Sequence, residues 1–83
     1  MSKEVLLSGF WFRTLRNHLG YTQQEVAVSL FMTSGSISRM ETGNVGSSER
    51  SRIYYQRFLL ERLDPIDPIW DFVNNAMKEV TIR

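Results

Sequence analysis

The chain has 83 residues, a net charge of +1, 42% hydrophobic residues and no cysteine, which fits one globular domain and excludes disulfides and cysteine-based catalytic or zinc sites. Such a short chain buries only about 60–65% of its unfolded surface, and a second copy of the chain often extends so thin a core. Residues 1–62 hold eight basic and five acidic side chains, while residues 63–83 hold two basic and four acidic ones. With this distribution of charge, one side of the protein could contact DNA, but not all of its surface.

Helical spacing of apolar side chains begins in the first quarter of the chain. The residues with this spacing are Phe12, Leu15 and Leu19. Ser8 is a candidate N-cap and Gly20 is a C-terminal stop, so the pattern predicts a helix from near Ser8 to Leu19. Residues 3–7 either extend this helix or form an apolar arm.

Two short helices are expected next. The stretch T-Q-Q-E at residues 22–25 has the capping-box pattern, in which a threonine hydroxyl and a glutamate three residues later satisfy each other's free backbone donors. Thr33 is a second candidate cap, and the helix after it is expected to continue to about Met40 and to end at Gly43. Ile37 and Met40 are its only large apolar residues, so its opposite face is expected to stay free.

Two further helices complete the predicted fold. Ser47 or Ser48 can cap a helix that reaches about Leu63. Asp67-Pro68 then combines a cap with proline at the first helical position, which is a strong start signal for the last helix.

The C-terminal region, residues 64–83, is interpreted as a dimerisation element. Its helix carries an apolar stripe that includes Trp70, Val73, Met77 and Val80. This stripe either contributes to a homodimer interface, which we expect, or closes the core of the single chain. Residues 80–83 alternate between apolar and polar side chains, like a short strand that pairs with a partner.

These patterns predict an all-α fold, a compact bundle of about five helices in one domain, residues 1–83, with a helix-turn-helix at about residues 22–42. In such a motif two short helices cross steeply, and the small side chain of Ala27 suits their close approach. The free face of the second helix would fit the major groove of DNA, which is wide enough to admit one helix.

Part of the chain also has a familiar pattern. It consists of T-Q-x-E at residues 22–25, I-S-R-M-E at residues 37–41, and the residues Ala27, Leu30 and Gly43. With these motifs residues 12–44, about 40% of the chain, closely resemble the phage Cro and repressor family of helix-turn-helix domains, also called the xenobiotic-response-element family. The resemblance implies a lambda-repressor-like fold and a DNA-binding transcriptional regulator.

The resemblance also implies which residues contact DNA. Gln23 matches a position that contacts a backbone phosphate, and Asn44 and residues 47–52 match a loop and helix start that lie near phosphate. The positions that face the groove are Thr33, Ser34, Gly35, Ser38 and Arg39. Arg50 and Arg52 either contact phosphate or belong to a solvated helix face.

Three charged residues receive more specific roles. Arg39 is the only side chain of the predicted recognition helix that can donate two hydrogen bonds to guanine O6 and N7, so we expect most base specificity to rest on it. According to the resemblance, Arg16 and Glu41 form a structural ion pair between the first and third helices. Loss of this pair is expected to lower stability more than it changes specificity.

Two residues depart from the family pattern. Phe31 stands at the turn, where the family usually has glycine. A bulky residue with positive φ costs about 1–2 kcal/mol, so either the turn has a different geometry or the helix before it runs longer. Gly35 lies inside the recognition helix at a cost of about 1 kcal/mol relative to alanine, and it either permits close approach of the backbone to DNA or is merely tolerated.

No catalytic, metal or cofactor site is expected. His18 is the single histidine and has neither a cysteine nor a cluster of carboxylates beside it, so we interpret it as a surface residue. The serines around Gly35 come with no nucleophile elbow, base or orienting acid. The sequence therefore does not indicate an enzyme.

A cytoplasmic location without a membrane partner is expected. No apolar run approaches the roughly 20 residues that span a bilayer. The first residues also lack the layout of a signal peptide, because Arg13 and Arg16 interrupt their apolar stretch.

The expected function is sequence-specific binding of double-stranded DNA by a homodimeric repressor on a palindromic operator, with half-site centres about 34 Å apart. The alternative is an antitoxin-like module that neutralises a small protein partner through its helices or tail and autoregulates its operon.

Overall fold

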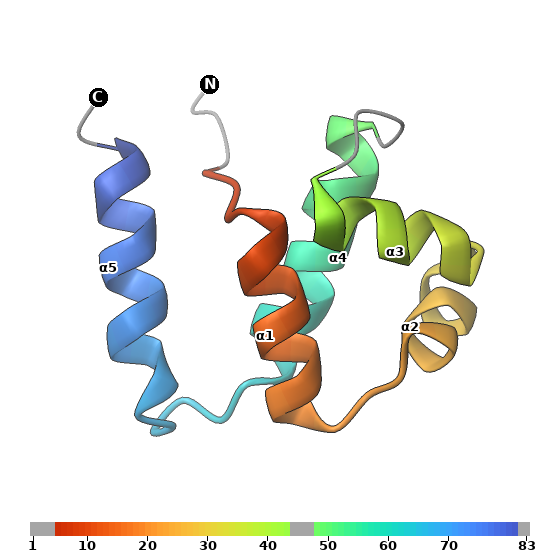
Figure 1. Ribbon diagram of the computed structural model, residues 1–83. Helices are drawn as coiled ribbons and strands as arrows, with labels where there is room; N and C mark the ends of the chain where they lie inside the picture. Colours follow the sequence, from red (N-terminus) through yellow and green to blue (C-terminus); the bar gives the residue numbers. More distant parts are fainter. Residues whose placement is uncertain (1–4, 44–47, 82–83) are drawn as a thin grey trace.

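The computed structural model describes residues 5–43 and 48–81, with side chains up to residue 78. Within these ranges the regular structure consists of five helices, as predicted, and contains no strand. They are α1 (Gly9–Leu19), α2 (Gln23–Leu30), α3 (Ser34–Thr42), α4 (Glu49–Arg62) and α5 (Ile69–Thr81). α1 lies at the centre, with α5 on one side of it, α2 and α3 on the other, and α4 behind (Figure 1). None of the helices in this part of the chain has the length and apolar character needed to cross a membrane.

Side-chain caps fix where the middle helices begin. The Thr22 hydroxyl accepts a hydrogen bond from the Glu25 backbone N–H at 3.1 Å, and the Glu25 carboxylate accepts one from the Thr22 N–H at 2.8 Å. The predicted capping box is therefore present. Thr33 caps α3 through the Ser36 N–H at 3.1 Å, and Ser48, one of the two predicted candidates, caps α4.

The core lies where α1, α3 and α4 meet, and α2 and α5 cover its two sides (Figure 1). Its buried apolar residues are Leu7, Phe12, Leu15, Val26, Ala27, Ile37, Met40, Tyr55, Phe58, Leu59, Leu63 and Val73. α1 crosses α3 with almost no space between the backbones, because a Cβ atom at Gly9 would overlap the carbonyl oxygens of Met40 and Glu41. Glycine is thus required at this crossing. No local sequence pattern predicts that α1 and α3 approach each other at this residue.

The segment before α1 is an arm and not an extension of the helix. Residues 5–7 are non-helical and lead into the N-cap Ser8. The side-chain amide of Gln56 on α4 holds this arm from both sides: it donates to the Val5 carbonyl at 2.7 Å and accepts from the Leu7 N–H at 2.7 Å. This paired contact places Leu7 in the core.

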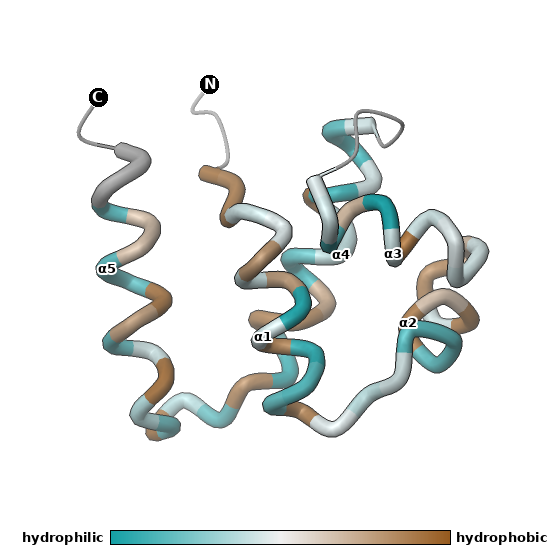
Figure 2. Tube along the Cα trace, in the orientation of Figure 1, coloured by the Kyte–Doolittle hydropathy of each residue, from teal (hydrophilic) through white to brown (hydrophobic). Residues whose placement is uncertain are grey.

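The C-terminal helix differs from the prediction at its end. α5 continues through Thr81, so residues 80–81 are helical and a strand at residues 80–83 is wrong for the part described. The described part of its apolar stripe packs against the core of the single chain, with Val73 fully buried and Trp70 and Met77 half-buried; its contribution to a homodimer interface stays a prediction. In Figure 2 the hydrophobic residues of α5 alternate with hydrophilic ones along the helix. This pattern is typical of a helix with one apolar side that packs against a core. The side chain of Val80 lies outside the described residues.

Candidate nucleic-acid interface

α2 and α3 are joined by a tight turn at Phe31. α2 ends at Leu30, and Phe31 takes the left-handed conformation with φ 57° and ψ 44° while its N–H donates to the carbonyls of Ala27 and Val28. Neither a different turn geometry nor a longer helix is found, so both expectations for this position are wrong. The turn keeps glycine-like geometry with a phenylalanine in it, at a cost of about 1–2 kcal/mol.

The two faces of α3 have opposite character. Ile37 and Met40 are buried and attach the helix to the core, together with the buried carboxylate of Glu41. On the opposite side, Gly35 and Arg39 are exposed, and Ser34 and Ser38 are half-exposed. The protein's own side chains therefore leave this outer face uncovered, and with the exposed cap Thr33 it presents hydroxyls and one guanidinium to the surroundings.

Arg39 rests along the outer face of α3 in an arrangement that is weakly held. Its Nη2 donates to the Ser36 hydroxyl at 3.2 Å, and that hydroxyl lies 3.0 Å from Oγ1 of Thr33. Both hydrogen bonds are exposed, so water molecules readily replace them when the Arg39 side chain moves. The guanidinium can therefore extend away from the helix at small energetic cost.

Gly35 has no internal reason to be glycine. A Cβ atom there would meet only Nη1 of Arg39 at 3.7 Å and Oγ1 of Thr33 at 3.8 Å, which are ordinary contact distances. Its φ is not in the left-handed region, in contrast to Gly20 and Gly43. The fold would thus accept alanine, a better helix former, at this position.

Glu41 is the centre of a buried polar cluster that joins four helices. Arg16 on α1 donates to its carboxylate through Nε at 2.5 Å and through Nη2 at 3.1 Å. Tyr55 on α4 donates its hydroxyl at 2.5 Å, and Gln23 on α2 donates its amide at 3.1 Å. The predicted Arg16–Glu41 ion pair is therefore present, within a larger Glu41 cluster made of Arg16, Gln23, Glu41 and Tyr55.

Two members of the Glu41 cluster change the sequence interpretation. Gln23 was expected to face a phosphate, yet its half-buried amide donates inward to Glu41. The side chain of Gln23 thus takes part in the helix–helix contact, and its predicted phosphate contact stays a prediction. Tyr55 was not predicted, although a tyrosine in an otherwise apolar helix face needs a partner for its hydroxyl when it is buried.

The Glu41 cluster keeps its charges at neutral pH. Burial raises the pKa of Glu41, but hydrogen bonds from Arg16, Tyr55 and Gln23 together outweigh burial, so the net pKa is lowered. The hydrogen bond to Glu41 raises the pKa of Arg16. Burial, and then the hydrogen bond to Glu41, raise the pKa of Tyr55 far above the physiological range. The carboxylate therefore stays ionised beside a protonated guanidinium and a neutral phenol.

The start of α4 lies at the same end of the molecule as α3 (Figure 1). Arg50 is exposed in its first turn. Arg52 is half-buried, and its Nε is buried without a hydrogen-bond partner among the described residues. Asn44 and Ser47 lie outside the described residues. Of the predicted phosphate contacts, Arg50 therefore has the most accessible guanidinium.

His18 belongs to a different part of the surface. Its Nε2 lies 2.7 Å from Oδ2 of Asp67, the residue that also accepts the Ile69 N–H before α5. The hydrogen bond from His18, followed by that from the Ile69 N–H, lowers the pKa of Asp67. His18 thus links α1 to the start of α5. Across residues 5–43 and 48–81, no three His, Cys, Asp or Glu side chains are grouped as a metal ion would require.

The outer face of α3 and the first turn of α4 together form the candidate interface. Its described residues are Thr33, Ser34, Gly35, Ser38, Arg39 and Arg50. Searches of protein-family models, curated proteins and solved structures found no match to this chain.

Proposed function

We propose that the chain binds double-stranded DNA through the outer face of α3 and acts as a transcriptional regulator of the helix-turn-helix type that it resembles. The observation that carries this proposal is the unequal burial of α3, a short helix anchored by Ile37, Met40 and Glu41 on one side only. The major groove has the width to receive the other side.

Each group on this face has a distinct task in the proposed complex. Arg39 extends from its resting position and donates two hydrogen bonds to a guanine, while the serine and threonine hydroxyls bond to bases or phosphates with less discrimination. Gly35 lets the backbone of α3 approach the duplex. Arg50 neutralises a phosphate beside the groove, where the N-terminal end of α4 adds a favourable dipole.

The Glu41 cluster supports this proposal because it sets the orientation of α3. Its hydrogen bonds tie α3 to α1, α2 and α4 at one point. A recognition helix held from three directions presents its outer side chains in a reproducible register, which specific readout requires. We therefore assign these residues to the positioning of the interface.

The regulator is proposed to act as a homodimeric repressor on an operator with two-fold symmetry. Two copies would place their α3 helices in successive major grooves, with half-site centres about 34 Å apart. A dimer that occupies a promoter blocks polymerase from the same DNA. The antitoxin-like alternative loses support, because the described part of the α5 stripe packs against its own core.

Selection of bound fragments from random duplex DNA tests the proposal. The wild-type protein should enrich a palindromic consensus containing a guanine at a fixed position in each half-site. Arg39→Ala should lose preference at that one base pair, with a penalty of roughly 1–3 kcal/mol on the preferred sequence.

Arg50→Ala is the matched control, because it removes an exposed arginine assigned to phosphate. It should weaken binding about equally on all sequences and reduce the slope of log K against log salt by about 1. Failure of the wild-type protein to enrich any consensus, or an equal loss on all sequences for Arg39→Ala, would contradict the proposed readout.

A further inference from the structure

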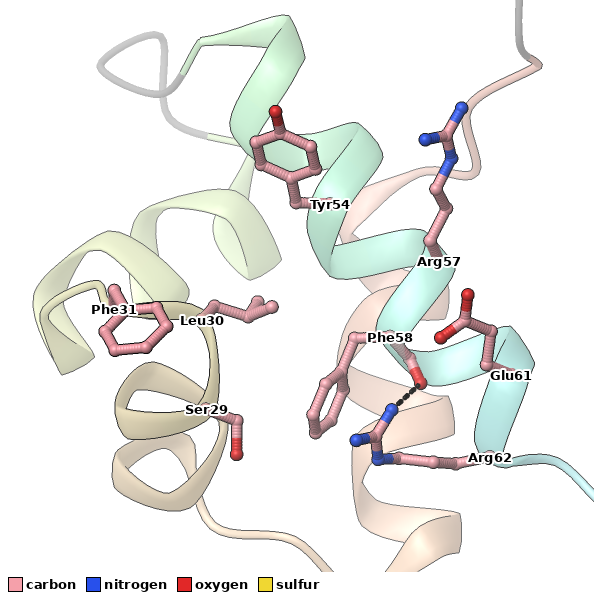
Figure 3. Close-up of a pocket in the computed structure, with 8 residues that line it drawn as sticks. All are labelled: Ser29, Leu30, Phe31, Tyr54, Arg57, Phe58, Glu61 and Arg62. Atoms are coloured by element: carbon pink, nitrogen blue, oxygen red, sulfur yellow. Dashed lines mark hydrogen bonds between the residues drawn. The ribbon is translucent and has the colours of Figure 1, made fainter.

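A groove lies between the end of α2 and the outer side of α4 (Figure 3). Its volume is about 460 Å³. Ser29, Leu30 and Phe31 stand on the α2 side, and Tyr54, Phe58 and Arg62 stand on the α4 side. None of these residues belongs to the proposed DNA interface or to the Glu41 cluster.

Phe31 protrudes at the edge of this groove. It is 99% exposed, and it holds a left-handed backbone conformation that glycine or asparagine would adopt with less strain. The fold gains neither apolar burial nor a relaxed backbone from this residue. Strained residues of this kind are concentrated at functional sites. A contact with another molecule would therefore explain why phenylalanine occupies this position.

The groove itself can receive an aromatic side chain. Leu30 is half-buried and Tyr54 is 49% exposed, while Phe58 is 5% exposed and forms part of the floor. The guanidinium of Arg62 lies 3.7 Å from the centroid of the Phe58 ring and donates to the Phe58 carbonyl at 3.1 Å. Glu61 also lines the groove. The patch therefore combines an apolar floor with one acidic side chain, Glu61, and two basic ones, Arg57 and Arg62.

We propose that this surface, the Phe31 groove, joins two copies of the chain, with Phe31 of one copy seated in the groove of the other. An isologous contact uses the same patch on both partners, so that patch must carry both halves of every interaction. The Phe31 groove does so: a protruding ring lies beside a hollow, and Glu61 lines the groove together with Arg57 and Arg62, so each copy offers both signs of charge to the other. The inference rests on the homodimer of the proposed function, and it names an interface that replaces the α5 stripe.

Sedimentation equilibrium without DNA, over a range of micromolar concentrations, tests the Phe31 groove. The wild-type chain should show a monomer–dimer equilibrium. Phe31→Gly removes the ring and relieves the backbone strain, so it should raise the melting temperature of the monomer. It should also weaken the dimer by roughly 10²–10⁴-fold, the worth of two buried phenylalanine side chains, one from each copy. Tyr54→Ser, on the opposite wall, should also weaken the dimer.

The control is Phe72→Ala, which removes a 64% exposed aromatic ring from α5, outside the residues that line the groove. It should leave the dimer unchanged. A monomeric wild-type chain at all concentrations, or a dimer lost in Phe72→Ala but kept in Phe31→Gly, would overturn the inference.

Binding of a single half-site duplex separates this inference from the proposed function. Phe31→Gly should bind one half-site as tightly as the wild-type chain does, and should lose affinity only for the two-half-site operator. If Phe31→Gly loses half-site affinity while its association state is unchanged, Phe31 contacts DNA and the self-association inference fails. If neither protein binds DNA but the wild-type chain dimerises through Phe31, the inference stands without the proposed function.

Discussion

Replacing Gly35 with alanine should make the protein more stable and a weaker DNA binder. The added Cβ meets only Arg39 and Thr33 at ordinary distances, so no steric penalty opposes the gain in helix propensity. Glycine in a helix costs roughly 0.5–1 kcal/mol relative to alanine, and we take the lower end because Gly35 is the second residue of α3. A gain of roughly 0.5 kcal/mol should raise the melting temperature by roughly 2–4 °C.

The expected effect on DNA has the opposite sign. In the proposed complex the backbone at Gly35 lies against the duplex, so a methyl group there pushes α3 outward and weakens the contacts beside it. Loss of one good base contact corresponds to roughly 1–3 kcal/mol, or about 5–150-fold in affinity. Thermal denaturation followed by circular dichroism and fluorescence anisotropy with the selected operator measure the two effects on the same preparation.

Asn17→Ala is the matched control for this experiment. Asn17 is exposed on α1, and its replacement also improves helix propensity. It should raise stability slightly and leave DNA affinity unchanged. If Gly35→Ala binds the operator as tightly as the wild-type protein, the backbone of α3 does not approach DNA at this residue and the proposed docking is wrong.

Two further predictions concern the contacts that fix the position of α3, which are the Glu41 cluster and the crossing with α1 at Gly9. Glu41→Gln leaves the buried guanidinium of Arg16 without a carboxylate, so urea denaturation at pH 7 should show a loss of roughly 3–5 kcal/mol. Because the native pKa of Glu41 is lowered, its contribution is fully present above the ordinary value of 4.5 and disappears as the pH falls below it. The stability difference between wild type and Glu41→Gln should therefore shrink as the pH falls below 4.5; a constant difference would contradict the ionised cluster. Gly9→Ala forces a methyl group into the backbone of α3 and should lower the unfolding free energy by roughly 1–3 kcal/mol, whereas unchanged stability would refute the close crossing of α1 and α3.

The beginnings of α2 and α3 could be predicted because their signals are local. A capping box depends on two side chains three residues apart, and both residues of the Thr22–Glu25 pair are visible in the sequence. The free face of α3 could also be predicted, since Ile37 and Met40 occupy one side of a short helix. Local spacing was sufficient in both cases.

Features that depend on the approach of distant segments could not be predicted in the same way. Tyr55 reaches Glu41 from α4, and Gly9 meets α3 across a gap too small for a methyl group. The apolar period of α5 indicated a buried side, but periodicity does not say whether the same chain or a second copy covers that side. At residues 80–83 apolar and polar side chains alternate over four residues only. The longer helical spacing of apolar residues before them is the stronger signal, and α5 continues through Thr81.

Phe31 shows how tertiary context overrides a local rule. Steric cost argues against phenylalanine in a left-handed turn, so a change of turn geometry was expected. The steep α2–α3 crossing, with Ala27 fully buried, keeps the glycine-like turn despite that cost.

An NMR titration of the ¹⁵N-labelled chain with the duplex recovered by selection tests most directly whether the outer face of α3 binds DNA. Amide signals of residues 33–39 and of the first turn of α4 should shift most, and those of α5 should shift little. Shifts concentrated on α5 or on the α1 surface around His18, with residues 33–39 unchanged, would contradict this mode of binding.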